Sequence, residues 1–309
     1  MEGQPVRVAA IDCGTNSLRL LIADIDGKNF REVHRDMRVV RLGQGVDKNR
    51  AFAPEAIERT LAVTAEYGAV LRAKGVERLR FCATSATRDA TNRDLFITGV
   101  EDILGVAPEV ISGAQEAALT FLGATKELGQ ELAPFLVVDI GGGSTEFVLG
   151  ERSVISARSV NIGCVRMSER HLNQQPPTSA QLAAATKDID AAISEAGELV
   201  DFTAAQTLIA VAGTATTVAA AALGLLEYDR HSIHLSRISA AQVHDVATMF
   251  ATMSREEIAA LGYMHPGRVD VITSGSLVLS RVMTLTGAQE FVASESDILD
   301  GIAWDLAEI

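Results

Sequence analysis

Residues 136–149 read Leu-Val-Val-Asp-Ile-Gly-Gly-Gly-Ser-Thr-Glu-Phe-Val-Leu, an apolar strand that ends at an acidic residue, a turn and a second apolar strand. Glycines accept positive φ, so the N–H groups of this turn can point into one concavity, where hydroxyls add further donors. Because no helix follows, the pattern predicts a β-hairpin loop that binds phosphate. An ordinary glycine-rich turn is the alternative, but Asp139 and Glu146 would have no role in one. The expected phosphate-binding residues are Gly141, Gly142, Gly143, Ser144 and Thr145.

A second copy of this pattern lies at residues 8–22, Val-Ala-Ala-Ile-Asp-Cys-Gly-Thr-Asn-Ser-Leu-Arg-Leu-Leu-Ile, and aligns with the first without gaps. Asp12 matches Asp139, and the strands on both sides match as well. We expect the two hairpins to face each other across a cleft, to grip a phosphate chain and to hold a hydrated metal ion with their aspartates. The phosphate-binding residues of this copy are expected to be Gly14, Thr15, Asn16 and Ser17.

These two motifs resemble the phosphate loops of the superfamily that contains acetate and sugar kinases, Hsp70 and actin. Within it the chain is most similar to the exopolyphosphatase and guanosine pentaphosphate phosphohydrolase (Ppx/GppA) family, because residues 83–92, 111–117 and 212–217 also agree. The resemblance implies an α/β fold of two ribonuclease H-like domains with an interdomain cleft. The expected domains are residues 1–125 and 126–295, with a C-terminal helix, about 296–309, that returns to the first domain.

The composition is that of an acidic globular protein. Its 309 residues are enough for two domains. The net charge of −13 argues against a nucleic-acid surface, so basic residues near the phosphate loops must bind a polyanionic substrate locally. Cys13, Cys82 and Cys164 lack metal-binding spacing, which predicts buried free thiols in a reducing cytoplasm. The N-terminal residues do not form a secretion signal, so a cytoplasmic protein is expected.

Residues 202–226 carry no charged side chain and are numerous enough to span a bilayer. Five threonines and the lack of a basic flank favour instead a buried strand, a turn and an alanine-rich helix, so no membrane association is expected. Because the turn follows a strand and opens a helix, Gly213, Thr214 and Thr216 are expected to form a third loop for an anion or a nucleoside. A plain helix start is the alternative.

Residues 77–84 alternate as a strand, and the turn after them brings Arg88 and Arg93 to its carboxyl end, where open α/β sheets bind ligands. Arg88 is expected to clamp a phosphate, because its planar guanidinium can hold two oxygens at once. The alternative is a surface arginine paired with Asp89 or Asp94. The family that the chain resembles has an arginine here, which favours the phosphate clamp.

Glu116 lies in the first turn of a helix expected from Ala114 to Leu128, with Ser112 as its N-cap. A carboxylate there suits the helix dipole, so a capping role for Glu116 is one interpretation. The other is a general base that orients and deprotonates the attacking water, the role that the resemblance implies. Gln115 stands where some relatives carry another acid, so Glu116 is the sole carboxylate candidate in this turn.

Three smaller expectations concern the second half of the chain. Gly163, in a loop before a helix, is expected to let the backbone approach the ligand. Ser294 is expected to cap a last helix that runs through Trp304. Because the histidines show no metal-binding spacing, His231 and His234 are expected to face solvent in a polar loop.

Hydrolysis of a phosphoanhydride needs charge neutralisation, an in-line water and a held leaving chain. Asp12, Asp139 and Glu146 are expected to hold Mg²⁺ mostly through water, with Mn²⁺ as an alternative ion. The hairpin loops and Arg88 are expected to bind the terminal phosphates and stabilise developing charge. Together with the resemblance, this predicts an exopolyphosphatase that releases orthophosphate. The expected catalytic residues are Glu116, Asp139, Glu146 and Arg88.

Two alternatives stay open. One is a guanosine pentaphosphate 5′-phosphohydrolase of the same family, and the other is a non-catalytic or polymerising nucleotide-binding module of the actin type. Longer family members continue into a C-terminal helical region beyond the point where this sequence stops, so a preference for short polyphosphate chains is expected. The resemblance also implies a homodimer.

Overall fold

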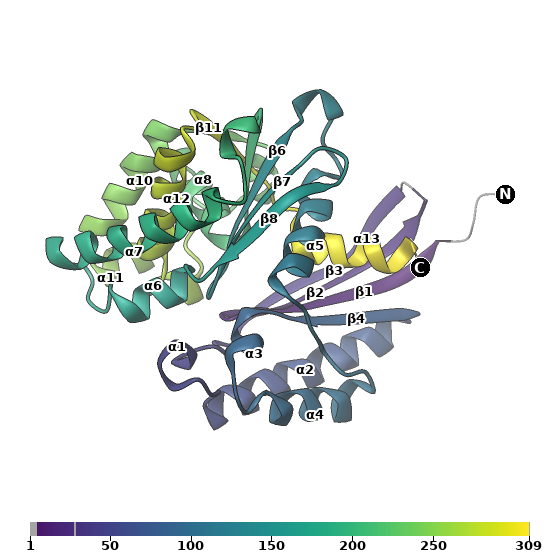
Figure 1. The fold of residues 1–309 in the computed structure, drawn as a ribbon. Coiled ribbons are helices and arrows are strands. Elements are labelled where there is room, and N and C mark those ends of the chain that lie inside the picture. Colours follow the sequence, from purple (N-terminus) through teal and green to yellow (C-terminus); the bar gives the residue numbers. More distant parts are fainter. Residues whose placement is uncertain (1–4, 28, 309) are drawn as a thin grey trace. The chain divides into compact units, whose positions relative to one another are not determined.

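The computed structural model describes residues 5–27 and 29–308. The chain divides into two compact units: the first runs to Gly123 and resumes at Ile298, and the second is Ala124–Asp297. Each unit contains a mixed β-sheet with helices packed against it, which confirms the predicted α/β class (Figure 1). The chain therefore passes between the units twice.

The sheet of the first unit has the strand order β3-β2-β1-β4-β5. β1 and β2 form the predicted first hairpin and β3 extends it antiparallel, whereas β4 pairs with β1, and β5 with β4, in parallel. β1 is buried from Val8 to Cys13, as expected of a central strand covered on both faces. The strands are β1 (Val6–Cys13), β2 (Ser17–Asp26), β3 (Asn29–Val39), β4 (Arg78–Ala83) and β5 (Glu109–Val110).

Helices cover both faces of this sheet (Figure 1). On one face α2 and α4 pack through a cluster that includes Phe96, and on the other α5 and α13 pack through a cluster that includes Trp304. α2 opens with Pro54 at its first position and ends where Gly75 adopts a φ of 65°. The helices are α1 (Val46–Asn49), α2 (Pro54–Lys74), α3 (Ser85–Asp89), α4 (Arg93–Leu104), α5 (Gly113–Thr125) and α13 (Ile298–Glu308).

The sheet of the second unit repeats this topology in the order β10-β11-β9-β6-β7-β8. β6, β7 and β8 are antiparallel neighbours, and β9 and β11 follow β6 in parallel. The β6–β7 hairpin thus holds the place of β1–β2 in the first sheet, so the sequence repeat is also a structural repeat. The strands are β6 (Phe135–Ile140), β7 (Thr145–Gly150), β8 (Val154–Val160), β9 (Thr207–Val211), β10 (Arg237–Ser239) and β11 (Glu290–Ala293).

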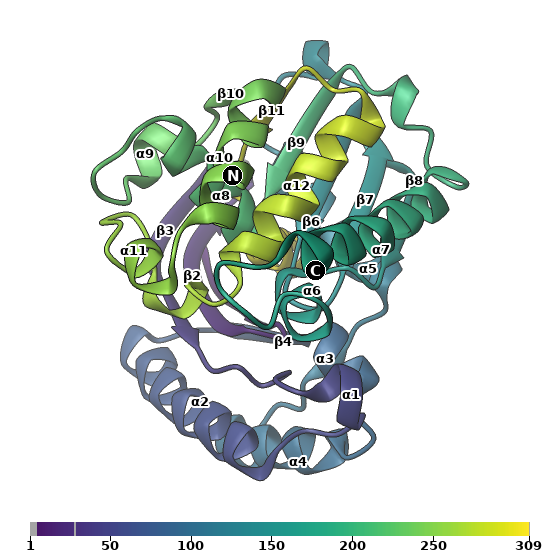
Figure 2. The ribbon, with the colours of Figure 1, turned by 90° about the vertical axis from the view of Figure 1, so that its left-hand side faces the viewer.

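Four helices, α7, α8, α10 and α12, pack over the sheet of the second unit (Figure 2). Their apolar faces join one cluster with Leu136, Val138 and Phe147 of the strands. α7 begins with a capping box at Thr178, whose side chain accepts from the N–H of Gln181. The helices are α6 (Cys164–Arg170), α7 (Ser179–Gly197), α8 (Ala212–Ala222), α9 (Arg230–Ile233), α10 (Ala240–Thr252), α11 (Arg255–Ala259) and α12 (Ile272–Thr286).

The uncharged stretch 202–226 contains a short 3₁₀ turn, β9 and α8, which confirms the predicted strand and helix. The turn expected between them was wrong, because α8 begins at Ala212 directly after β9 and includes Gly213 and Thr214. Among the residues that the structure describes, no helix is both long and apolar enough to cross a membrane. The three cysteines are buried free thiols, as predicted. Burial raises the pKa of Cys82 to about 12 and that of Cys164 to about 11, so both thiols are held in the unreactive protonated form.

The prediction for the start of the last helix was wrong. α13 begins at Ile298, not at Ser294. The hydroxyl of Ser294 accepts from the N–H of Ser296 at 3.1 Å and donates to its carbonyl oxygen at 2.8 Å. Serine side chains bond to nearby backbone as readily in turns as at caps, so the spacing alone could not separate the two.

Gly301 provides a test of how α13 holds α5 in place. A Cβ atom at Gly301 would overlap the carbonyl oxygen of Leu119 and lie 2.7 Å from its carbonyl carbon. We expect Gly301→Ala to lower the free energy of unfolding in urea by roughly 1–3 kcal/mol through overpacking. The control is Gly68→Ala in α2, whose nearest neighbour is the movable end of Leu104 at 3.1 Å. Equal stability of the two variants would contradict this account of the packing.

Candidate functional site

The first hairpin pairs an acidic residue with a basic one. Asp12 at the end of β1 and Arg19 on β2 are partners across the antiparallel ladder. Asp12 Oδ2 accepts from Arg19 Nε at 2.9 Å and from Arg19 Nη2 at 2.7 Å, and the carboxylate is buried. Arg19 is not among the predicted site residues, although it occupies the position that Glu146 holds in the second copy. Asp12 thus fixes a cation next to the first loop.

The loop of the first hairpin is held by backbone contacts. Gly14 N–H donates to the carbonyl oxygen of Ser17 at 3.0 Å, and Gly43 N–H donates to that of Thr15 at 2.9 Å. The hydroxyl groups of Thr15 and Ser85 lie 3.0 Å apart and share a hydrogen bond. Thr15 is therefore tied to two neighbouring segments, and a bond within the loop joins Gly14 to Ser17, which gives the loop a defined shape before any ligand binds.

The loop of the second hairpin rests on the start of α6. The N–H of Cys164 donates to the carbonyl oxygen of Gly141 at 2.9 Å, and Arg166 Nε donates to that of Gly143 at 2.6 Å. The N–H groups of Gly142 and Gly143 donate to no acceptor within residues 5–27 and 29–308. Carbonyl groups of this loop are thus engaged while two of its N–H donors are available, as in an anion-binding concavity.

The expectation about glycine conformation was wrong. Gly141, Gly142 and Gly143 are not among the glycines with positive φ. A glycine is required instead at position 163, where the backbone approaches this loop closely. A Cβ atom on Gly163 would lie 2.5 Å from the carbonyl carbon of Gly142 and 2.7 Å from the nitrogen of Gly143. Gly163 therefore lets the backbone before α6 approach the second loop, and its contact in the structure is with that loop.

Two carboxylates face each other in the second hairpin. Asp139 on β6 and Glu146 on β7 are ladder partners, so their side chains leave the same face of the sheet, and both are buried. The hydroxyl of Ser159 donates to Glu146 Oε1 at 2.7 Å. Two carboxylates suit Mg²⁺, which keeps several waters and takes few protein ligands. The described part of the chain contains no group of three or more histidine, cysteine or acidic side chains placed to hold a metal.

Arg88 and Glu116 form an ion pair in the first unit. Arg88, on α3, donates from Nη1 to Glu116 Oε2 at 2.6 Å and to the carbonyl oxygen of Ile111 at 2.9 Å. Glu116, in the first turn of α5, is buried. The structure therefore brings the expected phosphate clamp and the expected general base into direct contact, although they lie 28 residues apart in the sequence.

The alternative interpretations of these two residues were wrong. The reciprocal cap at the start of α5 is made by Gln115, whose Oε1 accepts from the N–H of Ser112 at 2.9 Å while its own N–H donates to the Ser112 hydroxyl at 3.2 Å. Asp89, the expected surface partner of Arg88, instead lies 3.9 Å from Arg50. Arg93 is exposed at the start of α4.

The predicted third loop is the sharp turn from β9 into α8. The helix begins directly at Ala212, which adopts a φ of 65°, while Thr214 and Thr216 are buried. Arg268 lies against this turn: its Nη1 donates to the hydroxyl of Thr217 at 3.0 Å, and a Cβ atom on Gly213 would lie 2.5 Å from its Nε. A guanidinium thus faces the third loop, which adds positive charge that the sequence analysis did not assign to it.

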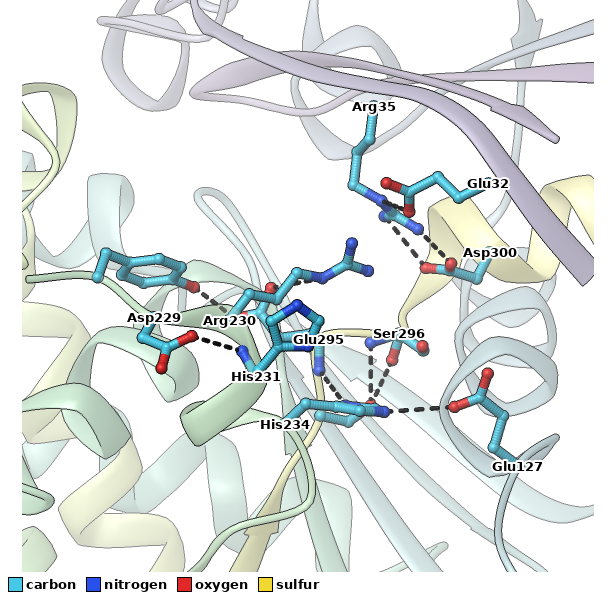
Figure 3. A network of polar contacts seen from close by, with 12 residues as sticks. Glu32, Arg35, Glu127, Asp229, Arg230, His231, His234, Glu295, Ser296 and Asp300 are labelled. Atoms are coloured by element: carbon cyan, nitrogen blue, oxygen red, sulfur yellow. Dashed lines mark hydrogen bonds and ion pairs between the residues drawn. The ribbon is translucent and has the colours of Figure 1, made fainter.

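His234 is half-buried, so the prediction that it faces solvent was wrong, whereas His231 is exposed as expected. The Nδ1 atom of His234 accepts from the N–H of Glu295 at 3.1 Å, and the Nε2 atom of His234 lies 3.3 Å from Glu127 Oε2 (Figure 3). Because Nδ1 accepts a hydrogen bond, the proton of the neutral ring is on Nε2. In the first unit the same view shows Arg35 bound to Glu32 and Asp300.

Two copies of this sheet topology, each with an acidic hairpin loop, define the ribonuclease H-like class of α/β proteins. Within that class the chain belongs to the Ppx/GppA phosphatase family, whose sequence pattern matches residues 21–308. It is 47% identical to exopolyphosphatase 2 of Mycobacterium tuberculosis over 97% of this chain and 98% of that protein.

Two further relatives bear on the substrate. A crystal structure described as an exopolyphosphatase-like protein superimposes with a TM-score of 0.95 at 46% identity, covering 98% of both chains. The guanosine-5′-triphosphate,3′-diphosphate pyrophosphatase of Vibrio atlanticus is 36% identical over 64% of this chain and 39% of that protein. The similarity to proteins named exopolyphosphatase is therefore both higher and more complete.

Gly163 provides a test of how the second loop is supported. We expect Gly163→Ala to displace the loop, because the added Cβ would meet backbone atoms that cannot move aside. Binding of orthophosphate, measured by calorimetry, should weaken at least about tenfold, which corresponds to ~1.4 kcal/mol. Gly197→Ala at the end of α7 is the control, since its Cβ would meet only the ring of Phe202 at 3.3 Å. Unchanged phosphate binding in Gly163→Ala would show that the loop does not depend on this contact.

Proposed function

We propose that the protein is an exopolyphosphatase that hydrolyses the terminal phosphoanhydride bonds of inorganic polyphosphate and releases orthophosphate. The extended similarity to a protein named exopolyphosphatase supports this substrate class. The mechanism rests on one observation in particular, the Arg88–Glu116 ion pair, in which the carboxylate is buried and the guanidinium is partly exposed. It sets a carboxylate that can accept a proton beside a guanidinium that can bind the phosphate under attack.

Each hairpin loop supplies donors for phosphate oxygens within its own unit. The available N–H groups of Gly142 and Gly143 and the cation Arg19 supply donors for non-bridging oxygens. Arg88 binds the terminal phosphate through the guanidinium fork that also contacts Glu116. Because these donors are fixed by the fold before substrate arrives, they can stabilise the charge that develops in the transition state without reorganising.

Asp139 and Glu146 are the residues that would hold a divalent cation, Mg²⁺ or Mn²⁺. When bound there, such an ion would neutralise charge on the phosphoryl oxygens. Ser159 fixes one oxygen of Glu146, so the carboxylate is oriented in the absence of an ion. Asp12 is assigned a different role from the one expected, because its carboxylate holds Arg19.

Glu116 is the group that orients and deprotonates water. It lies in the first turn of α5, and Arg88 fixes the direction of its carboxylate. Gln115 caps the helix, which relieves Glu116 of that task. Phosphoryl transfer asks little covalent chemistry of a protein, so a positioned base and fixed cations are a sufficient set.

Guanosine pentaphosphate is the second candidate substrate. The similarity to a guanosine-5′-triphosphate,3′-diphosphate pyrophosphatase and the guanidinium of Arg268 at the third loop favour it. Gly213, Thr214 and Thr216 would then lie near the nucleoside or its 3′-diphosphate. Preference for short chains, the homodimer and the cytoplasmic location stay predictions.

Replacement of the base tests the mechanism. We expect Glu116→Gln to lower kcat on polyphosphate by about 10²–10⁴-fold, because glutamine cannot accept the proton of the attacking water. Substrate binding should persist, since the phosphate contacts are made by other residues. Glu101→Gln, an exposed position on α4, is the matched control and should retain full activity. Wild-type turnover in Glu116→Gln would remove this residue from the reaction.

A substrate comparison tests the specificity. Release of orthophosphate is measured from short polyphosphate, long polyphosphate, guanosine pentaphosphate and ATP at equal concentrations of chain ends, with Mg²⁺ and after chelation. We expect short polyphosphate to be cut fastest. We also expect all release to stop on chelation, because the three arginines neutralise only part of the negative charge of the phosphates and a cation bound by the two carboxylates would have to neutralise the rest. Faster release from guanosine pentaphosphate would favour the second candidate, and faster release from long chains would contradict the chain-length prediction.

A further inference from the structure

A polar cavity of about 280 Å³ lies in the second unit between the end of β8 and one face of α7. β8 is the edge strand of its sheet, and α7 packs beside it (Figure 2). The helix contributes Asp188, Ala191, Ala192 and Glu195, which share one face because they are spaced by three and four residues. The two small alanines between the acidic residues leave the space open.

Two ion pairs form the ends of this cavity. Glu195 binds Arg158 of β8, and Asp188 accepts from Arg170 Nη1 at 2.7 Å. His171 lies at the second end as well, with its Nε2 2.8 Å from Asp188. Both acidic residues therefore already have cationic partners, so they do not prevent an anion from entering.

One donor of Arg158, a residue that lines the cavity, lacks an acceptor. The Nε–H of Arg158 is buried and has no hydrogen-bond partner within the described part of the chain. A buried donor on a charged group is costly to leave unsatisfied, and an oxyanion is the acceptor that a guanidinium binds best. The side-chain amide of Asn161 also lines the cavity, where it can supply a second donor.

The cavity is connected to the proposed reaction site through β8. Ser159 lines the cavity and follows Arg158 directly in the strand, and its hydroxyl donates to Glu146 Oε1. A ligand that draws Arg158 toward itself would strain the adjacent peptide and so change the orientation of Glu146. Arg158, Ser159 and Glu146 thus form a contiguous set of contacts through which the cavity and the reaction site can be coupled.

We propose that this cavity binds a small oxyanion, that orthophosphate is the ligand, and that its binding slows turnover through Ser159 and Glu146. The effect on turnover rests on the proposed function, because orthophosphate is the product of that reaction. The cavity is larger than one orthophosphate ion, so the ion binds together with water. The site is distinct from the glycine loops, since none of their residues lines it.

Binding is tested by observing arginine Nε–H groups in ¹H–¹⁵N spectra of the full chain. The signal of Arg158 is identified by its loss in Arg158→Gln, and Arg152→Gln, an exposed residue of the turn before β8, is the control. We expect orthophosphate to shift the Arg158 signal saturably at millimolar concentration. A signal that stays in place while those of other arginines move would overturn the site. An equal or larger shift with acetate would keep an oxyanion site and overturn orthophosphate as its ligand.

Regulation is tested by orthophosphate inhibition of polyphosphate hydrolysis. In Arg158→Gln the non-competitive part of the inhibition, which added substrate does not relieve, should be lost, so that its inhibition constant for orthophosphate rises at least about tenfold. Arg152→Gln should behave as wild type. Ala192→Leu, which fills the cavity while Arg158 remains, should give the same loss. If both cavity variants are inhibited like wild type, the coupling is wrong. A protein that cuts no polyphosphate would refute the proposed function, while the spectra would still decide whether the cavity binds phosphate.

Discussion

The antiparallel register of the two hairpins determines the chemistry of both loops. In each one, the last acidic residue of the first strand stands directly opposite a residue of the second strand: Asp12 opposite Arg19, and Asp139 opposite Glu146. Ladder partners leave the same face of a sheet, so whichever residue occupies the second position meets the aspartate. A shift of one residue would move either partner to the other face and abolish both arrangements. One backbone pattern thus yields a fixed cation in one unit and a pair of carboxylates in the other.

Close packing of backbone, more than unusual backbone conformation, explains the glycines near these loops. Gly163 allows the segment before α6 to touch the second loop, and Gly43 allows another segment to touch Thr15 of the first. Gly301 plays the same part between α13 and α5, the helix that carries Glu116. Each contact removes the freedom of a loop or helix that bears a functional group. Preorganisation of this kind reduces the ordering that a substrate would otherwise have to impose.

Features set by local sequence could be predicted, and features set by long-range contacts could not. The hairpins and the strand and helix of residues 202–226 follow from neighbouring residues, and all were predicted. The contact between Arg88 and Glu116 depends on how α3, which follows β4, and α5, which follows β5, come together, and no short pattern encodes this.

Competition between adjacent residues was a second limit. Gln115 and Glu116 both lie in the first turn of α5, and both types can cap a helix. Only the structure shows that Gln115 reaches Ser112 while Glu116 turns toward Arg88. The same ambiguity affected Ser294, whose hydroxyl closes a turn with Ser296 before α13 begins. Arg19 was not predicted for another reason. The alignment of the two copies identifies the residues that they share, whereas this position differs between them, with arginine at 19 and glutamate at 146.

That difference bears on how an acidic protein can bind a polyanion. At a net charge of −13 the chain as a whole repels such a ligand, so attraction must come from cations fixed at the loops. Arg19, Arg88 and Arg268 are each held by an oxygen acceptor of the protein, which fixes the direction of each guanidinium. A guanidinium carries five N–H donors in a planar fork that matches phosphate oxygens. With a glutamate opposite Asp12, the first hairpin would carry a second pair of carboxylates in place of a fixed cation, and attraction for a polyanion would depend on Arg88, Arg268 and any bound ion. Under the proposed function, the arginine in one copy therefore lets the repeated hairpin contribute positive charge where the other copy contributes two carboxylates.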